Sequence, residues 1–196
     1  MLFRSQMLAK GHDFPRITLV GVINADGAMF SADFRAAERM VAQLTQVAGR
    51  AGRADLPGRV LIQTRFAAHP LYQAVARQDH PRFAEVAAAE RKRANLPPYS
   101  FLALLRAESR DAAALTAFMQ TCIDAAQKLQ PPQALQVWDA VPAPLARRSG
   151  FTRQQIMLQS TSRRALQEFL ARWIAHIRES APHAIHWAID VDPQEV

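Results

Sequence analysis

Gln46-Val47-Ala48-Gly49-Arg50-Ala51-Gly52-Arg53 joins a run with helical periodicity to a turn that contains two glycines. Arg50 and Arg53 are three residues apart, so a helix end or a tight turn can project both guanidinium groups to the same side. Two such groups suit the spread negative charge of a transferring phosphoryl group, and glycines let the backbone approach it closely. The stretch therefore indicates half of a nucleotide site. The alternative is a solvated, arginine-rich helix end that complements the helix dipole.

The segments on both sides of this octet have the pattern of an α/β unit. Residues 17–23 form a continuous apolar run rich in β-branched side chains, which is typical of a strand buried on both faces of a parallel sheet. Ser31 or Asp33 is expected to cap a helix that leads to the octet, and a second strand is predicted at 60–64. The order predicts part of an open sheet, with polar residues at the connections where such sheets bind ligands.

The rest of the chain predicts a second domain of a different class. Pro70 opens a helical region that runs through Arg93 with an interruption at 79–81, and Leu96-Pro97-Pro98 stops it. Beyond it the patterns predict strands near 101–107, 135–138, 153–159 and 184–191, with helices at 111–129 and 162–179. This βαββαβ order is the split β-α-β arrangement, with two helices on one face of an antiparallel sheet. We therefore expect an α/β unit at 1–68, a helical connector at 69–98 and an α+β domain at 99–196.

The composition of the chain limits the kinds of molecule that the protein is expected to bind. Of the formal charge of +7, residues 1–98 carry +6 and residues 99–196 carry +1. This bias favours a polyanion, nucleic acid or nucleotide ahead of a membrane, because no apolar run approaches the ~20 residues that a spanning helix needs. The single cysteine, Cys122, allows neither an intrachain disulfide nor a cysteine-based zinc site, and its apolar surroundings predict a buried thiol. Without a signal-peptide pattern, a cytoplasmic location is expected.

The octet is very similar to the Gln-x-x-Gly-Arg-x-Gly-Arg motif that closes the second RecA-like lobe of superfamily-2 helicases. More narrowly, the chain resembles the family of primosomal protein N-prime (PriA), the bacterial replication-restart helicases. The stretches that carry this resemblance are 5–14, 30–39, 46–53, Leu96-Pro97-Pro98, 141–144, the arginines 147, 148 and 153 with Gln155, and 190–193. The resemblance spans residues 5 to 196. It implies a partial RecA-like lobe followed by the family's carboxy-terminal domain.

The resemblance implies an ATP-dependent DNA helicase that recognises stalled forks and directs primosome assembly for replication restart. The implied partners are forked or single-stranded DNA, single-strand-binding protein and other primosomal proteins, with no membrane. ATP and magnesium would serve the complete protein, as would zinc, although this chain has no zinc ligands of that family. A Walker A loop and an Asp-Glu-x-His box are missing from the sequence, so the chain alone is predicted to be inactive. The alternative is a stand-alone, non-catalytic DNA- or protein-binding module whose arginine turn is only an anion patch.

The resemblance also implies roles for single residues at the nucleotide. Arg50 and Arg53 are expected to reach the ATP phosphates held by the first lobe and to stabilise charge in the transition state. Further nucleotide contacts are implied for Gln46, Gly49, Gly11 and Asp13. For the loop that holds Gly11 and Asp13, the alternative is a turn whose aspartate caps a helix.

DNA contacts are implied in both parts of the chain. Ser5 and Lys10 are expected to lie towards a DNA phosphate. Arg147, Arg148 and Arg153 flank a turn with Gly150 and Phe151, a combination that could hold a DNA backbone while the ring stacks on an exposed base. Trp138, Trp173 and Trp187 fall in apolar patterns and are expected in the core.

Overall fold

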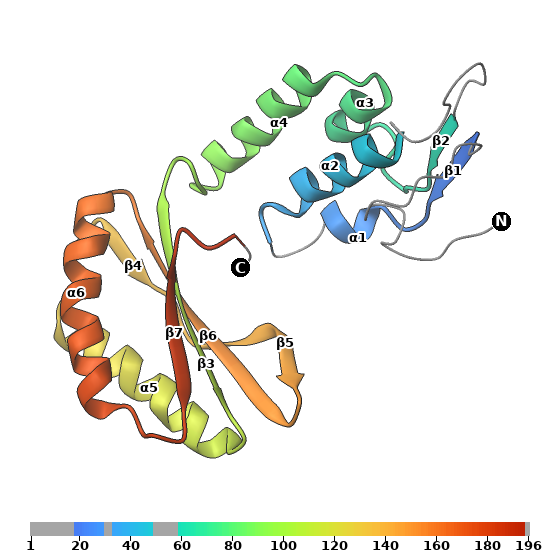
Figure 1. Cartoon of the computed structure of the whole chain (residues 1–196). Helices are drawn as coiled ribbons and strands as arrows, with labels where there is room; N and C mark the ends of the chain where they lie inside the picture. The colour runs from blue at the N-terminus through green and yellow to red at the C-terminus, as the bar shows by residue number, and fades with distance from the viewer. Residues whose placement is uncertain (1–17, 30–32, 49–58, 195–196) are drawn as a thin grey trace. The chain divides into compact units, whose positions relative to one another are not determined.

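The computed structural model describes residues 18–29, 33–48 and 59–194 (Figure 1). The chain divides into two compact units, Met1–Ala89 and Glu90–Val196. The division falls inside the helix that precedes Leu96-Pro97-Pro98, and each unit has a hydrophobic core of its own. The chain is therefore a mixed α/β protein with a small parallel sheet in one unit and an antiparallel sheet in the other.

The first unit contains the predicted strand, helix and strand. β1 (Leu19–Val22) and β2 (Arg59–Ile62) pair in parallel, with α1 (Asp26–Met29) and α2 (Ala36–Ala48) between them in the chain. α3 (Pro70–Ala76) and α4 (His80–Arg93) follow; residues 77–79 separate them, two residues before the predicted interruption at 79–81. Apolar side chains of α2 recur at helical spacing and pack with Tyr72 of α3; the buried members are Ala25, Met40, Val41, Leu44 and Tyr72.

The prediction that the first strand is buried on both faces is wrong for the described residues. Val20 is buried and Val22 packs against the core, whereas Leu19 is 57% exposed. Leu61 of β2, on the same face as Leu19, is 60% exposed. Side chains alternate along a strand, and the described residues pack against only one face of this two-stranded sheet. Whether this unit belongs to a RecA-like lobe stays a prediction.

The second unit has the predicted elements and one more strand. β3 (Phe101–Ser109), α5 (Ala112–Lys128), β4 (Leu135–Val137), β6 (Phe151–Ser160), α6 (Arg163–Ser180) and β7 (His186–Val191) match the predicted order. The strands lie in the order β4-β6-β3-β7 with every pair antiparallel, and α5 and α6 cover one face (Figure 1). The strand that the sequence patterns missed is β5 (Val141–Arg148), which pairs with β6.

There are physical reasons why the sequence pattern does not predict β5 as a strand. Its two prolines have no backbone N–H to donate, and its pairing with β6 is irregular between Pro142 and Arg147. Only Ala143 among its residues is buried, so apolar and polar positions do not alternate between two environments. For an edge strand of this composition, the sequence alone predicts a loop.

The core of the second unit lies between the sheet and its two helices. Trp173 is fully buried, and its indole N–H donates to the backbone carbonyl of Cys122 at 2.8 Å. Cys122 is buried as predicted, and Trp187 is partly buried against the same core. Trp138 contradicts the expectation of a core residue because it is 43% exposed. It directly follows β4, one residue after Val137, which packs against the core, and so falls on the other face of the sheet.

Candidate nucleic-acid interface

Most residues predicted to contact nucleotide, and two predicted to contact DNA, lie outside the described residues. These are Ser5, Lys10, Gly11, Asp13, Gly49, Arg50 and Arg53. Gln46, the first residue of the octet, lies exposed in the last turn of α2, which ends at Ala48. The octet therefore begins on a helix end, and the roles of these residues stay predictions.

A carboxylate that the sequence analysis did not single out organises the connections after β1 and β2. Asp26 accepts hydrogen bonds from the Thr64 hydroxyl, from the backbone N–H of Arg65 at 2.9 Å and from the Tyr72 hydroxyl at 3.0 Å. The Thr64 hydrogen bond, followed by that of the Arg65 backbone, lowers the pKa of Asp26 below its ordinary value of 3.8. This carboxylate thus ties the turn after β1 to the segment after β2 and to α3.

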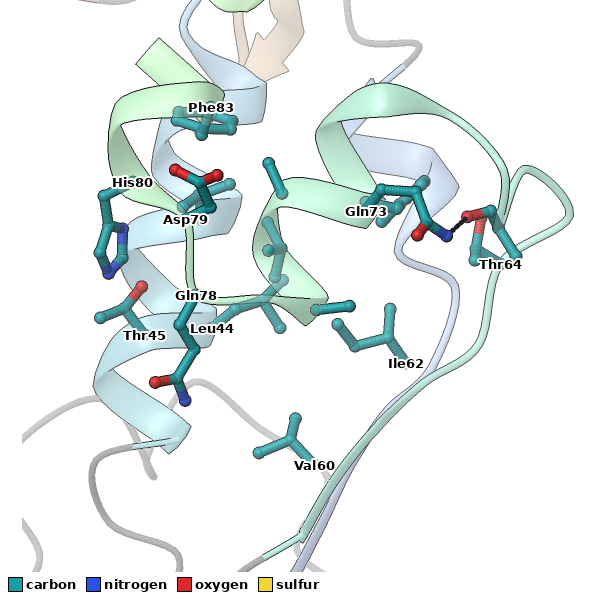
Figure 2. A pocket seen from close by; sticks show the side chains of 16 residues that line it. Leu44, Thr45, Val60, Ile62, Thr64, Gln73, Gln78, Asp79, His80 and Phe83 are labelled. Carbon is teal, nitrogen blue, oxygen red and sulfur yellow. Dashed lines mark hydrogen bonds between the residues drawn. The ribbon is translucent and has the colours of Figure 1, made fainter.

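A cavity of about 600 Å³ lies within the first unit (Figure 2). Side chains of α2, β2, α3 and the start of α4 line it, among them Leu44, Ile62 and Phe83. Asp79 also lines it, but its carboxylate accepts from the backbone N–H of Arg82 at 3.0 Å and so serves the start of α4. The walls of the cavity mix apolar side chains with polar ones such as Thr64, Gln73 and His80.

The hairpin of β5 and β6 places the three predicted DNA-binding arginines. Its two-residue turn consists of Ser149 and Gly150, whose φ angles of 51° and 82° are those of a tight hairpin turn of the primed class. Arg148 pairs with Phe151 and Arg147 pairs with Thr152 across the ladder. Adjacent residues of a strand point to opposite faces, so Arg147 and Arg148 lie on different faces of the sheet.

Arg153 joins Arg148 on the face opposite the helices. Its Nε lies 3.4 Å from a carboxylate oxygen of Glu108 on β3, and the other oxygen of Glu108 lies 3.9 Å from Nδ1 of His186 on β7. The side chain of Arg153 is only 26% exposed, because this ion pair holds it against the sheet. The structure thus brings together Arg148 and Arg153 and separates both from Arg147.

A group from β7 and one from the residue that follows β3 lie beside Phe151. Its ring centroid lies 5.8 Å from that of His186 in a stacked arrangement with an interplanar angle of 29°. The Arg110 guanidinium carbon lies 5.3 Å from the Phe151 centroid. Arg110 and His186 were not predicted from the sequence. Strand alternation in β3 could have found Arg110, but His186 enters only through the pairing of β7 with β3.

A cleft of about 260 Å³ lies beside this cluster. Arg106, Glu108, Arg153 and His186 line it, together with apolar groups such as Ala143. A further ion pair joins Arg106 to Asp190 at 3.2 Å. The arrangement supplies cationic and aromatic groups side by side, which is the chemistry of a nucleic-acid surface.

The described part of the chain contains neither a cluster of metal-ligand side chains nor a helix suited to a membrane. No group of three or more His, Cys, Asp and Glu side chains gathers there in the way that metal ligands do. Among the helices of residues 18–29, 33–48 and 59–194, none has the length and apolar character needed to cross a membrane.

Comparisons with known proteins place the chain in a family. The family model described as the primosomal protein N C-terminal domain matches residues 92–194. Curated relatives named "Replication restart protein PriA" include those of Haemophilus influenzae, Synechocystis sp. and Bacillus subtilis, which are 39%, 35% and 35% identical to the chain. They align with 100%, 100% and 98% of this chain. The chain spans only 27%, 23% and 24% of their respective lengths.

The family match covers the unit in which the arginine and aromatic cluster lies. The aligned relatives extend the similarity to the first unit and to the octet. The ordered motifs of the sequence and these comparisons agree, and the chain belongs to the family of the primosomal protein N (PriA) carboxy-terminal domain.

Proposed function

We propose that this chain is the carboxy-terminal region of an ATP-dependent DNA helicase that recognises stalled replication forks and directs primosome assembly for replication restart. The observation that carries the proposal is the alignment of the whole chain with proteins named for replication restart. Forked or single-stranded DNA, single-strand-binding protein and other primosomal proteins are the proposed partners of the complete protein.

The first unit is proposed to be the end of the second RecA-like lobe. Its parallel strands and the helix that leads into Gln46–Arg53 support this assignment. Arg50 and Arg53 would face the phosphates of ATP, and Gln46, Gly49, Gly11 and Asp13 would line the same cleft. ATP with magnesium would supply the hydrolysis that drives movement along DNA; the arginines would stabilise the charge that develops on the phosphates.

The second unit is proposed to contact DNA. The cationic and aromatic groups around the β5–β6 hairpin support this role, and Arg148 and Arg153 belong to the set expected from the sequence. Ser5 and Lys10 of the first unit would add phosphate contacts. A non-catalytic DNA- or protein-binding module is the rival function, in which the octet would be only an anion patch.

The test uses the complete protein that carries this region. Arg50→Ala and Arg53→Ala should each lower the maximal rate of DNA-stimulated ATP hydrolysis by about 10³-fold or more, as the loss of an arginine finger does. Arg59→Ala is the matched control, because Arg59 is an exposed arginine of β2 outside the octet. The 196-residue chain alone should show no magnesium-dependent turnover with or without forked DNA. Unchanged turnover of correctly folded Arg53→Ala protein would show that the octet arginine does not act on the nucleotide.

A further inference from the structure

The antiparallel sheet has one face that α5 and α6 do not cover. Leu105 of β3 and Ile156 of β6 are paired neighbours in the core under the helices. Alternation then places Arg106 and Glu108 on the opposite face, where Ala188 and His186 of β7 pair with them. On the same side Leu102, Leu104 and Gln155 are buried, so the centre of this face is covered. We call this side of the sheet the open face because of its exposed groups at the hairpin end and beside β4.

Aromatic groups stand at two positions along β6 on the open face. Phe151, with His186 beside it, is near the hairpin turn. Trp138 is near the other end, where its backbone N–H donates to the carbonyl of Met157 at 2.9 Å. The six residue-to-residue steps from 151 to 157 cover roughly 20 Å of strand. His186 and Trp138 are exposed, with 66% of the His186 side chain and 43% of Trp138 accessible to solvent.

Arginines accompany these rings. Arg153 is paired with Glu108 and Arg106 with Asp190, so the two pairs bring little net charge but hold the guanidinium groups in place. Arg110 over Phe151 and Arg148 opposite it add two cations at the hairpin end. Arginines next to aromatic rings, at two separate positions on this face, suit a polymer in which phosphates alternate with flat apolar groups. Base pairs of a duplex hide their faces, so the rings can stack only on unpaired bases.

We propose that the open face binds single-stranded DNA, with bases stacking on the Phe151–His186 pair and on Trp138 and with phosphates held by Arg110 and Arg148. The proposal deepens the DNA-binding role given above and rests on it. It differs from the site expected from the sequence in two respects. Arg147, on the helix side of the hairpin, and Arg153, which is paired with Glu108, are left out as phosphate contacts. Arg110 after β3, Trp138 after β4 and His186 of β7 are brought in.

The experiment measures fluorescence anisotropy of a labelled oligothymidine and of a duplex of equal length, titrated with the whole 196-residue chain. Phe151→Leu and Trp138→Leu should each weaken single-strand binding by about tenfold, as expected for a lost stacking partner, and change duplex binding much less. Arg148→Ala should lower the slope of log K against log salt by about 0.7 on the single strand. Arg178→Ala, an exposed arginine of α6 on the covered side, should match the unaltered chain. Circular dichroism would establish that each variant is folded.

The outcomes separate this proposal from the function on which it rests. Equal losses for Arg147→Ala and Arg148→Ala, with no loss for the two ring variants, would place DNA on the hairpin edge and overturn the open-face site alone. Binding of the oligothymidine that survives all open-face changes would do the same. If the unaltered chain binds neither the oligothymidine nor the duplex, the DNA role of the region fails together with the site. Tighter binding to duplex than to single strand would also overturn the stacking proposal.

Discussion

Asp26 shows how much of the first unit depends on one side chain. A hydroxyl of Thr64, a backbone N–H of Arg65 and a hydroxyl of Tyr72 all donate to its carboxylate. Each donor stabilises the ionised form, and the Thr64 hydrogen bond has the largest effect on the pKa. The charge of Asp26 therefore contributes to stability in a pH-dependent way.

Asp26→Asn is expected to lower the melting temperature at pH 7. The folded-state pKa lies below the unfolded value of about 4, so the stabilisation is fully present above pH 4. It is lost as pH falls through the lower folded-state pKa. The difference in melting temperature between the unaltered chain and Asp26→Asn should thus shrink as the pH falls below 4. Asp139→Asn, at an exposed position of the second unit, is the control. A difference that stays constant from pH 7 to pH 3 would contradict this account.

Cys122 provides a second prediction for a single residue. Burial raises the pKa of its thiol to about 12, and the thiolate is the form that reacts. At pH 8 a disulfide reagent such as Ellman's reagent should leave the native chain unlabelled and should label its one thiol after unfolding in urea. Cys122→Ala gives the background signal. Rapid labelling of the native chain would show that the α5–α6 core opens readily.

At the scale of elements, the helices of the second unit start where short polar side chains cap them. Asp111 accepts from the backbone N–H groups of Ala113 at 2.9 Å and Ala114 at 3.0 Å, and α5 begins at the next residue. Ser162 does the same for α6 by accepting from Ala165 at 3.3 Å. These caps use backbone donors that a helix leaves unsatisfied at its start, so they define both boundaries locally.

Asp111→Ala is expected to destabilise the second unit by about 1 kcal/mol, because it removes the acceptor for two backbone donors. Asp111→Asn should keep most of the stability, since its amide oxygen can still accept. Asp124→Ala is the matched control on the exposed side of α5, where a single contact with Gln120 should be worth about 0.3 kcal/mol. Urea unfolding followed by tryptophan fluorescence measures all three. Equal losses for Asp111→Ala and Asp111→Asn would show that capping is not the cause.

At the scale of the whole molecule, two cores imply two cooperative units. Leu44 belongs to the first core and Leu166 to the second, and both are buried. All three tryptophans belong to the second unit, so their fluorescence reports on that unit. This separation makes it possible to follow one unit inside the intact chain.

Leu166→Ala should shift the fluorescence-detected transition towards lower urea by the equivalent of about 2–5 kcal/mol, as large-to-small core changes do. Leu44→Ala should leave the fluorescence-detected transition unchanged. It should shift only the unfolding of the first unit, which far-ultraviolet circular dichroism detects and tryptophan fluorescence does not. A fragment of residues 90–196 should unfold at the midpoint of the fluorescence transition. A common shift of both signals by either substitution would mean that the units unfold as one.

The sequence patterns predicted those features of the structure that depend on residues close together in the chain. The apolar period placed β3, α5, β6 and α6 close to their observed bounds, and the caps and prolines set the ends of the helices. The ordered motifs also identified the family, because each motif is a local pattern that can be recognised without the fold. The Gln46–Arg53 octet and the family resemblance belong to this class of information.

Tertiary structure decided what depends on partners far away in the chain. β1 has the composition of a fully buried strand, yet Leu19 is exposed because burial depends on what packs on each face. Trp138 lies on the open face and not in the core, because side chains alternate between the two faces along β4 and the residue after it. Arg147 and Arg148 are neighbours in the sequence, but the hairpin places them on different faces of the sheet. Strand pairing brings Arg110 and His186 next to Phe151. Local patterns give each side chain a face within its own strand; only register and packing determine which other faces it meets.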